Sequence, residues 1–151
     1  MSGGNAGRRA GVEPGAADGN GVQDWIAWTQ VIVERIVQMI KTDSGPFIVI
    51  DGATPFYLQF SWSRNEAALR CEAVSSFYLD DAHQLSKAQD AAMRDMGWHP
   101  PGWGDAKNSH NYVRVYYAPT NPVMLAALAG STLREIYNAN AQRLRWRAAT
   151  G

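Results

Sequence analysis

The chain has 151 residues and a mass of 16.6 kDa, of which 46% are hydrophobic and 11% aromatic. This is enough apolar material for one globular core, and the chain is too short for two. The 14 Lys and Arg residues balance 14 Asp and Glu residues, so the net charge gives no reason to expect a nucleic-acid or membrane partner. Cys71 is the only cysteine, which excludes an intramolecular disulfide and favours a reducing, cytoplasmic location.

The first element in chain order is a tail, followed by a helix. Residues 1–21 are rich in glycine and contain no aromatic residue, leucine or isoleucine, so a disordered tail is predicted there, with a single domain over residues 22–147. Asn20 and Gln23 have the spacing of a capping box, which favours a helix start. The apolar residues that then recur at intervals of three and four are Trp25, Trp28, Ile32, Ile36, Met39 and Ile40. The turn residues 43–46 should end this helix.

The hydrophobic period changes to two after Pro46, which predicts three strands at 47–50, 56–62 and 69–77. Short turns between consecutive strands imply an antiparallel meander. A second helix is predicted over 87–96, with Ser86 and Gln89 as its capping box and Gly97 as a left-handed cap. Residues 98–104 form a loop rich in proline and glycine, and residues 111–118 alternate as a further strand.

The last predicted element is a helix that begins with Asn121 as N-cap and Pro122 as first residue. It extends to Tyr137 and fades into the basic run 143–147, whose arginines are attributed to the helix C-terminus in preference to a phosphate-binding role. The predicted fold class is α+β, an antiparallel sheet of about four or five strands with helices packed on one face. The expected order is helix, three strands, helix, one or two strands, helix.

Several short motifs occur between residues 46 and 138. They are YLQF at 57–60, RCEAVS at 70–75, LS with Gln89 at 85–89, MGWHPP at 96–101, NY at 111–112 and TLREIY at 132–137. In this order they resemble the actinobacterial TY-Chap family, whose domains are related to type III secretion chaperones and to the YbjN-like domain. The resemblance implies a secretion-chaperone-like fold, a peptide- or protein-binding role and, as in the secretion chaperones, a homodimer.

Strand alternation predicts where a partner would bind. If Val113, Val115 and the apolar positions of the earlier strands face the helices, the intervening residues lie on the opposite face. A tyrosine-rich face with mixed charges is typical of recognition surfaces. The predicted partner-binding residues are Tyr57, Gln59, Arg70, Glu72, Val74, Tyr112, Arg114 and Tyr116. The alternative is that the charged residues form ordinary cross-strand pairs on a solvated sheet.

No motif points to catalysis, a metal or a cofactor. His83, His99 and His110 lie in predicted loops without metal-ligand spacing, and Cys71 alternates with core residues, where a lone cysteine is usually inert. There is no phosphate-binding glycine motif. The chain is therefore predicted to be a non-catalytic binding protein without a cofactor.

Two alternatives to the chaperone role stay open, an immunity protein that neutralises a toxin and a regulatory dimerisation domain. The loop between Trp98 and Trp103 also allows two interpretations. The tryptophans either fold back as a lid on the core or anchor a ligand, and the lid is favoured.

Overall fold

The computed structural model describes residues 21–104, 110–119 and 121–149, so nearly all of the predicted tail lies outside the described residues. The main elements are α3 (Val22–Thr42), β1 (Phe47–Asp51), β2 (Tyr57–Ser63), β3 (Ala68–Ala73), α4 (Lys87–Asp95), β4 (Tyr112–Tyr117), α5 (Pro122–Ser131) and β5 (Leu144–Ala148). A π-helical segment, Thr132–Ile136, continues α5. The predicted α+β class is confirmed.

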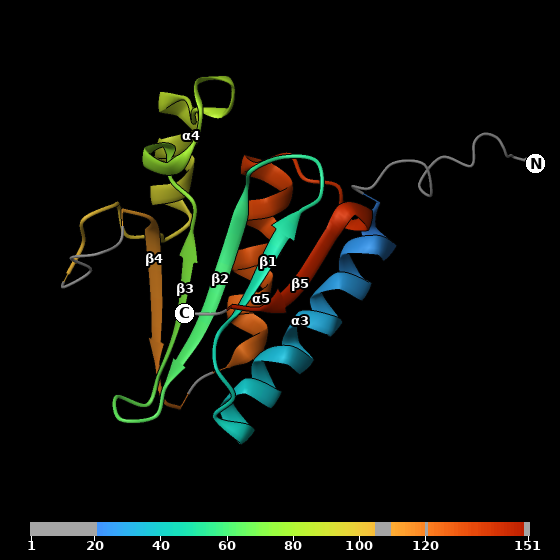
Figure 1. Cartoon of the computed structure of the whole chain (residues 1–151), viewed down its shortest axis with the longest axis vertical. Coiled ribbons are helices and arrows are strands. Elements are labelled where there is room, and N and C mark those ends of the chain that lie inside the picture. Colours follow the sequence, from blue (N-terminus) through green and yellow to red (C-terminus); the bar gives the residue numbers. More distant parts are fainter. Residues whose placement is uncertain (1–20, 105–109, 120, 150–151) are drawn as a thin grey trace, which may run out of the picture.

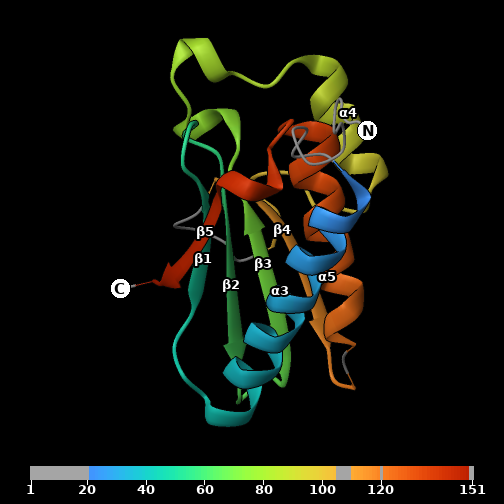
Figure 2. The same cartoon turned by 90° about the vertical axis from the view of Figure 1, so that its right-hand side faces the viewer.

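The five strands form one antiparallel sheet in the order β4-β3-β2-β1-β5. Strands β1 to β3 form the predicted meander. Figure 1 shows β5 on the outside of β1, next to α3, and Figure 2 shows α3, α4 and α5 on one side of the sheet. The fifth strand follows the last helix in the chain. The interpretation of residues 143–147 as the fading end of that helix is therefore wrong.

Helix α3 is amphipathic and covers the sheet through four buried residues, Trp25, Ile32, Ile36 and Met39. Its N-cap is Gly21, and Asn20, the first residue of the predicted capping box, lies outside the described residues. The helix ends where predicted, at Asp43, which has a left-handed φ of 50°.

The two long helices pack closely because α5 presents a glycine to α3. A Cβ on Gly130 would lie 3.2 Å from Trp28, closer than most side-chain contacts allow. Beneath these helices the sheet contributes buried side chains such as Leu58, Phe60 and Leu69. One side of the sheet is thus sealed into the core.

Helix α4 begins as predicted from the sequence. Ser86 and Gln89 form a reciprocal capping box, and Gly97 follows the helix with a φ of 100°. The Gln89 amide also donates to the carbonyl of Ile136 at 2.9 Å. This bond joins α4 to the end of the last helix.

Candidate functional site

The side of the sheet that faces away from the helices is the candidate functional site. Its residues follow from the strand register, because directly opposed residues of antiparallel strands point to the same face. No helix of the described part of the chain covers this side (Figure 2). We call it the open face, and its residues are Ile48, Ile50, Tyr57, Gln59, Ser61, Arg70, Glu72, Val113, Val115, Tyr117, Arg145 and Arg147.

One row of the open face crosses all five strands. In the order of the sheet it runs Arg147, Ile48, Gln59, Glu72, Val113. The row therefore mixes apolar and polar side chains, and its middle three are partly exposed whereas Val113 is buried. Such a mixture offers a partner both apolar contact and hydrogen-bonding groups.

A hydrogen-bonded cluster fixes the polar side chains near one end of the open face. The Asn111 amide nitrogen donates to the Tyr57 hydroxyl at 3.2 Å and lies 3.4 Å from Glu72 Oε1. Glu72 Oε2 in turn lies 3.3 Å from Arg70 Nε. Partial burial is the main cause that raises the pKa of Tyr57, so this hydroxyl stays protonated at neutral pH. The cluster presents prearranged donors and acceptors.

The Pro- and Gly-rich loop borders the open face beside β4. Trp103 is 39% exposed and stacks on His99, with 3.9 Å between the ring centres. His99 pairs with Val113 through two backbone hydrogen bonds of 2.8 and 3.1 Å, which holds the loop against the edge of β4. Trp103, Arg70 and Val115 help to line a pocket of about 510 Å³. The open face is therefore hollowed at this end.

The two tryptophans of this loop have different environments. Trp98 is 2% exposed, and its indole N–H donates to the Thr132 hydroxyl at 2.9 Å. The lid interpretation is confirmed for Trp98. Trp103 points to the surface instead.

Of the eight residues predicted to bind a partner, four share the open face as expected. These are Tyr57, Gln59, Arg70 and Glu72. Their role in binding stays a prediction.

The alternation predicted for β4 is wrong by one residue. Tyr112 lies opposite Ala73, Arg114 opposite Cys71 and Tyr116 opposite Leu69. These three partners are buried under the helices, so the two tyrosines and the arginine lie on the covered face. Val113 and Val115 lie on the open face, the reverse of the prediction.

The contacts of these residues agree with that correction. The Tyr112 hydroxyl donates to Asp90 of α4, and Arg114 Nη1 donates to the Gly97 carbonyl at 2.9 Å. The Arg114 guanidinium also lies over the Tyr116 ring at 4.9 Å. These side chains join β4 to α4 and the residues that follow it.

Val74 is the remaining predicted site residue, and its placement is also corrected. It follows the end of β3 and is fully buried. Its carbonyl accepts a 2.6 Å hydrogen bond from the Tyr137 hydroxyl. Phe77, predicted to end the third strand, lies instead in a short 3-10 turn with 66% exposure and stacks on His110.

Sequence reasoning missed five apolar or aromatic residues of the open face: Ile48, Ile50, Val113, Val115 and Tyr117. A signal for the isoleucines was present, since residues 47–50 are all apolar and half of a two-period strand must face away from the core. Their partners across β2, Gln59 and Tyr57, were already assigned to this face.

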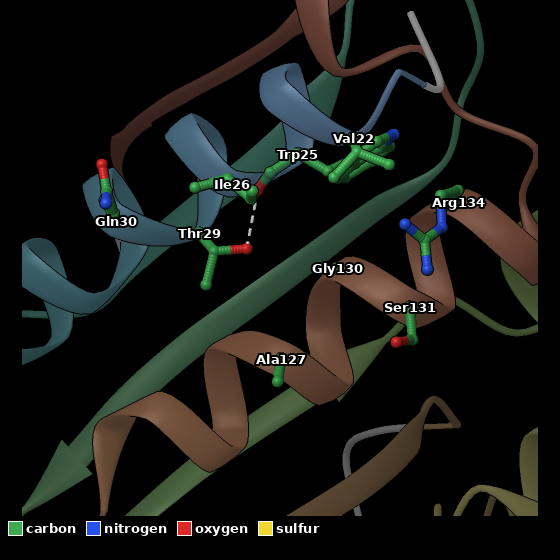
Figure 3. A pocket seen from close by; sticks show the side chains of 9 residues that line it. All are labelled: Val22, Trp25, Ile26, Thr29, Gln30, Ala127, Gly130, Ser131 and Arg134. Carbon is green, nitrogen blue, oxygen red and sulfur yellow. Dashed lines mark hydrogen bonds between the residues drawn. The ribbon is translucent and has the colours of Figure 1, made fainter.

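A second depression lies on the helix side, between α3 and α5. It has a volume of about 320 Å³ and is lined by apolar side chains that include Val22 and Ile26, with Arg134 at one end (Figure 3). Within it the Thr29 hydroxyl donates to the Trp25 carbonyl at 2.8 Å, and Arg134 is paired with Glu135 at 3.3 Å. The Thr29 hydroxyl and the Arg134 guanidinium thus have partners inside the protein.

The reactive groups of the described residues do not converge. Cys71 is fully buried, and burial raises the pKa of its thiol well above the usual value, so the group stays an inert thiol. Across residues 21–104, 110–119 and 121–149, no three histidine, cysteine or acidic side chains gather as metal ligands. Over the same residues no helix is long and apolar enough to cross a membrane.

Comparison with known proteins identifies the family. A family model described as TY-Chap3, T3SS (YopN, CesT) and YbjN peptide-binding chaperone 3, matches residues 18–144. The chain belongs to this family. No curated protein and no solved structure shows significant similarity to it. The TY-Chap3 match covers every strand of the open face except most of β5, so the peptide-binding description applies to the domain that carries this face.

Proposed function

We propose that this TY-Chap3 protein is a non-catalytic, chaperone-like domain that binds a segment of a protein partner on its open face. The observation that supports this most directly is the one-sided packing of the sheet, with α3, α4 and α5 all on the other face (Figure 2). The described residues leave Ile48, Ile50 and Val115 only partly covered. The peptide-binding description of the family supports the same role.

The open face has the physical properties that such binding needs. Its isoleucines and valine supply apolar area, and each Å² removed from water contributes about 25 cal/mol. The cluster of Tyr57, Asn111 and Glu72 is already ordered by internal hydrogen bonds, so a partner pays little entropy to fix these side chains. A partner segment can therefore gain both affinity and orientation here.

A charge placed in the centre of the open face tests the proposal. Peptides selected from a random library on the wild-type chain would be measured by fluorescence anisotropy against Gln59→Arg and Gln38→Arg. Gln59 is central in the open face, whereas Gln38 is exposed on α3, so the two changes are chemically identical. We expect Q59R to weaken binding about tenfold and Q38R to leave it unchanged. Equal affinities for both variants would contradict the proposal.

Two further properties, the oligomeric state and the cellular location, are proposed by analogy with the secretion chaperones. We expect a homodimer in the cytoplasm, on the strength of the family resemblance and the single reduced cysteine. Light scattering coupled to size exclusion, over a range of protein concentrations, measures the oligomeric state directly. A mass that stays at 16.6 kDa would contradict the dimer.

A further inference from the structure

The outer edge of β5 is available for pairing with another strand. The Arg143 carbonyl accepts from Gly52 N–H and the Ala149 N–H donates to the Pro46 carbonyl, so odd-numbered residues direct their backbone groups towards β1. By the alternation of an antiparallel ladder, Trp146 and Ala148 direct their N–H and C=O groups outwards. No strand of the described part of the chain pairs with that side.

A groove runs beside this edge, between β5 and α3. Trp146 divides it into two depressions, one of about 310 Å³ next to Val31 and one of about 340 Å³ next to Met39. Val31 and Trp146 are 44% and 42% exposed, which is unusual for large apolar side chains that lie close together. The Arg35 guanidinium lies 4.1 Å from the centre of the Trp146 ring and supports it from one side.

The open-face side of the same strand is basic. Arg145 and Arg147 are exposed and lie opposite Ile50 and Ile48. Neither arginine forms an ion pair with another described residue, and Asp24, which lines the same depression as Arg145, accepts from the Gln142 amide. Arg145 Nη1 donates to backbone carbonyls at 2.9 and 3.0 Å, which leaves its other N–H groups for a ligand.

We propose that an extended partner segment with alternating apolar and acidic residues adds to β5 as a sixth, antiparallel strand. Its backbone would pair with the outward groups of Trp146 and Ala148. Its apolar side chains would enter the two depressions on either side of Trp146, and its acidic side chains would lie beside Arg145 and Arg147. The inference rests on the proposed function only in assuming that the protein binds peptides.

A second copy of the chain fits this edge less well. If two antiparallel β5 strands were related by a twofold axis perpendicular to the sheet, the open faces of both copies would lie on the same side of the joined sheet. Arg145 and Arg147 of one copy would then lie directly opposite the same arginines of the other. Like charges in directly opposed positions destabilise a strand pair, so the edge favours an acidic segment.

The test uses the full chain and two fluorescein-labelled peptides that differ only in charge. One carries Ser-Gly-Leu-Glu-Val-Glu-Leu-Gly-Ser and the other has lysine in place of both glutamates. We expect the glutamate peptide to bind the wild-type chain about tenfold more tightly, with a preference that weakens in high salt. Equal affinity for the two peptides, or no binding of the glutamate peptide, would overturn the inference.

Charge reversal on the protein provides the matched experiment. In the R145E/R147E variant the preference should switch to the lysine peptide, a gain that misfolding cannot produce. The control R64E/K87E changes the net charge equally, and both residues are exposed and distant from β5 in the sequence. It should keep the wild-type preference. A switch in the control as well would show that only the overall charge matters and would overturn the inference.

The backbone contribution is tested by Ala148→Pro. Proline removes an N–H that points to solvent, a change that edge strands tolerate, and a thermal melt would verify that the variant folds. We expect about tenfold weaker binding of the glutamate peptide. If Q59R abolishes binding of this peptide while A148P does not, the edge inference fails and the proposed function stands.

Discussion

The Tyr112 hydroxyl on β4 donates a 2.5 Å hydrogen bond to the Asp90 carboxylate on α4. This contact joins the outermost strand on one side of the sheet to the second helix. Asp90 also accepts from Arg94 at 2.9 Å, so two donors hold one carboxylate. The hydrogen bond from Tyr112 is the main cause that lowers the pKa of Asp90, and burial together with this bond raises the pKa of Tyr112.

The first prediction concerns Tyr112→Phe. Removing the buried hydroxyl should lower the free energy of unfolding by about 1–2 kcal/mol, the cost of a hydrogen bond to a charged group. It should also raise the pKa of Asp90 towards its ordinary value. Urea unfolding and carboxyl titration by NMR measure the two effects. Tyr117→Phe is the control, because Tyr117 is 63% exposed, and its effect should stay within about 0.5 kcal/mol.

The same pair gives a pH dependence with a definite sign. The folded pKa of Asp90 lies below its ordinary value of 3.8, so the folded state binds the proton more weakly than the unfolded state. The stabilisation is complete above that value and is lost as the pH falls through the folded pKa. We expect the wild-type chain to lose more stability than Y112F below about pH 4. If the free energy of unfolding fell equally with pH in the wild-type chain and in Y112F, the hydrogen bond from Tyr112 would not be the cause of the lowered Asp90 pKa.

A second prediction follows from the buried bond between Trp98 and Thr132. Thr132→Val keeps the shape of the side chain but leaves the Trp98 indole N–H buried without its acceptor. The free energy of unfolding should fall by about 1–3 kcal/mol. Thr42→Val is the matched control, since the Thr42 hydroxyl also donates to a helix carbonyl but is exposed. Equal losses in the two variants would mean that the indole bond contributes nothing.

A third prediction concerns the ion pair that anchors the start of β5. The Asp51 side chain is 0% exposed, and its Oδ1 lies 2.9 Å from Ala53 N and 3.3 Å from Arg143 Nε. Arg143→Met should cost about 2–3 kcal/mol because it leaves a buried carboxylate without its cation. Adding Asp51→Asn should recover part of that loss, whereas Arg147→Met alone should change stability little. A double variant as unstable as the sum of the single variants would contradict the pairing.

Most of the secondary structure could be predicted because each element carries local signals. The Ser86 and Gln89 capping box and the turn at residues 43–46 act within a few residues, so the sequence alone contains them. No local signal of this kind determines which face of the sheet each residue of β4 points to. Residues 112–117 read YVRVYY, and both alternating sets are apolar enough to face a core. Long-range contacts, Tyr112 with Asp90 and Arg114 with Gly97, determine which of the two sets faces the helices. A slip of one residue in the pairing would move every side chain of the strand to the other face.

The strand β5 shows a different reason for failure. Leu144, Trp146 and Ala148 alternate with Arg145 and Arg147, which is a two-period pattern. The preceding helix and the high charge favoured a helix end instead. Only pairing with β1, nearly a hundred residues earlier in the chain, makes this segment a strand. The open face was accordingly half predictable: Tyr57, Gln59, Arg70 and Glu72 were placed on it correctly, whereas its residues on β1, β4 and β5 were not.

The position of β5 beside β1 also constrains how the molecule comes together during synthesis. Strand β1 carries the run Phe47–Ile50, entirely apolar, and its neighbour on that side is the last strand of the sheet. Until β5 has left the ribosome, this hydrophobic strand has an unpaired edge, which is the type of surface that promotes aggregation. Strand β5 with its arginines therefore protects the edge of β1 only at the end of synthesis. We expect a chain that is truncated just before Leu144 to self-associate through β1.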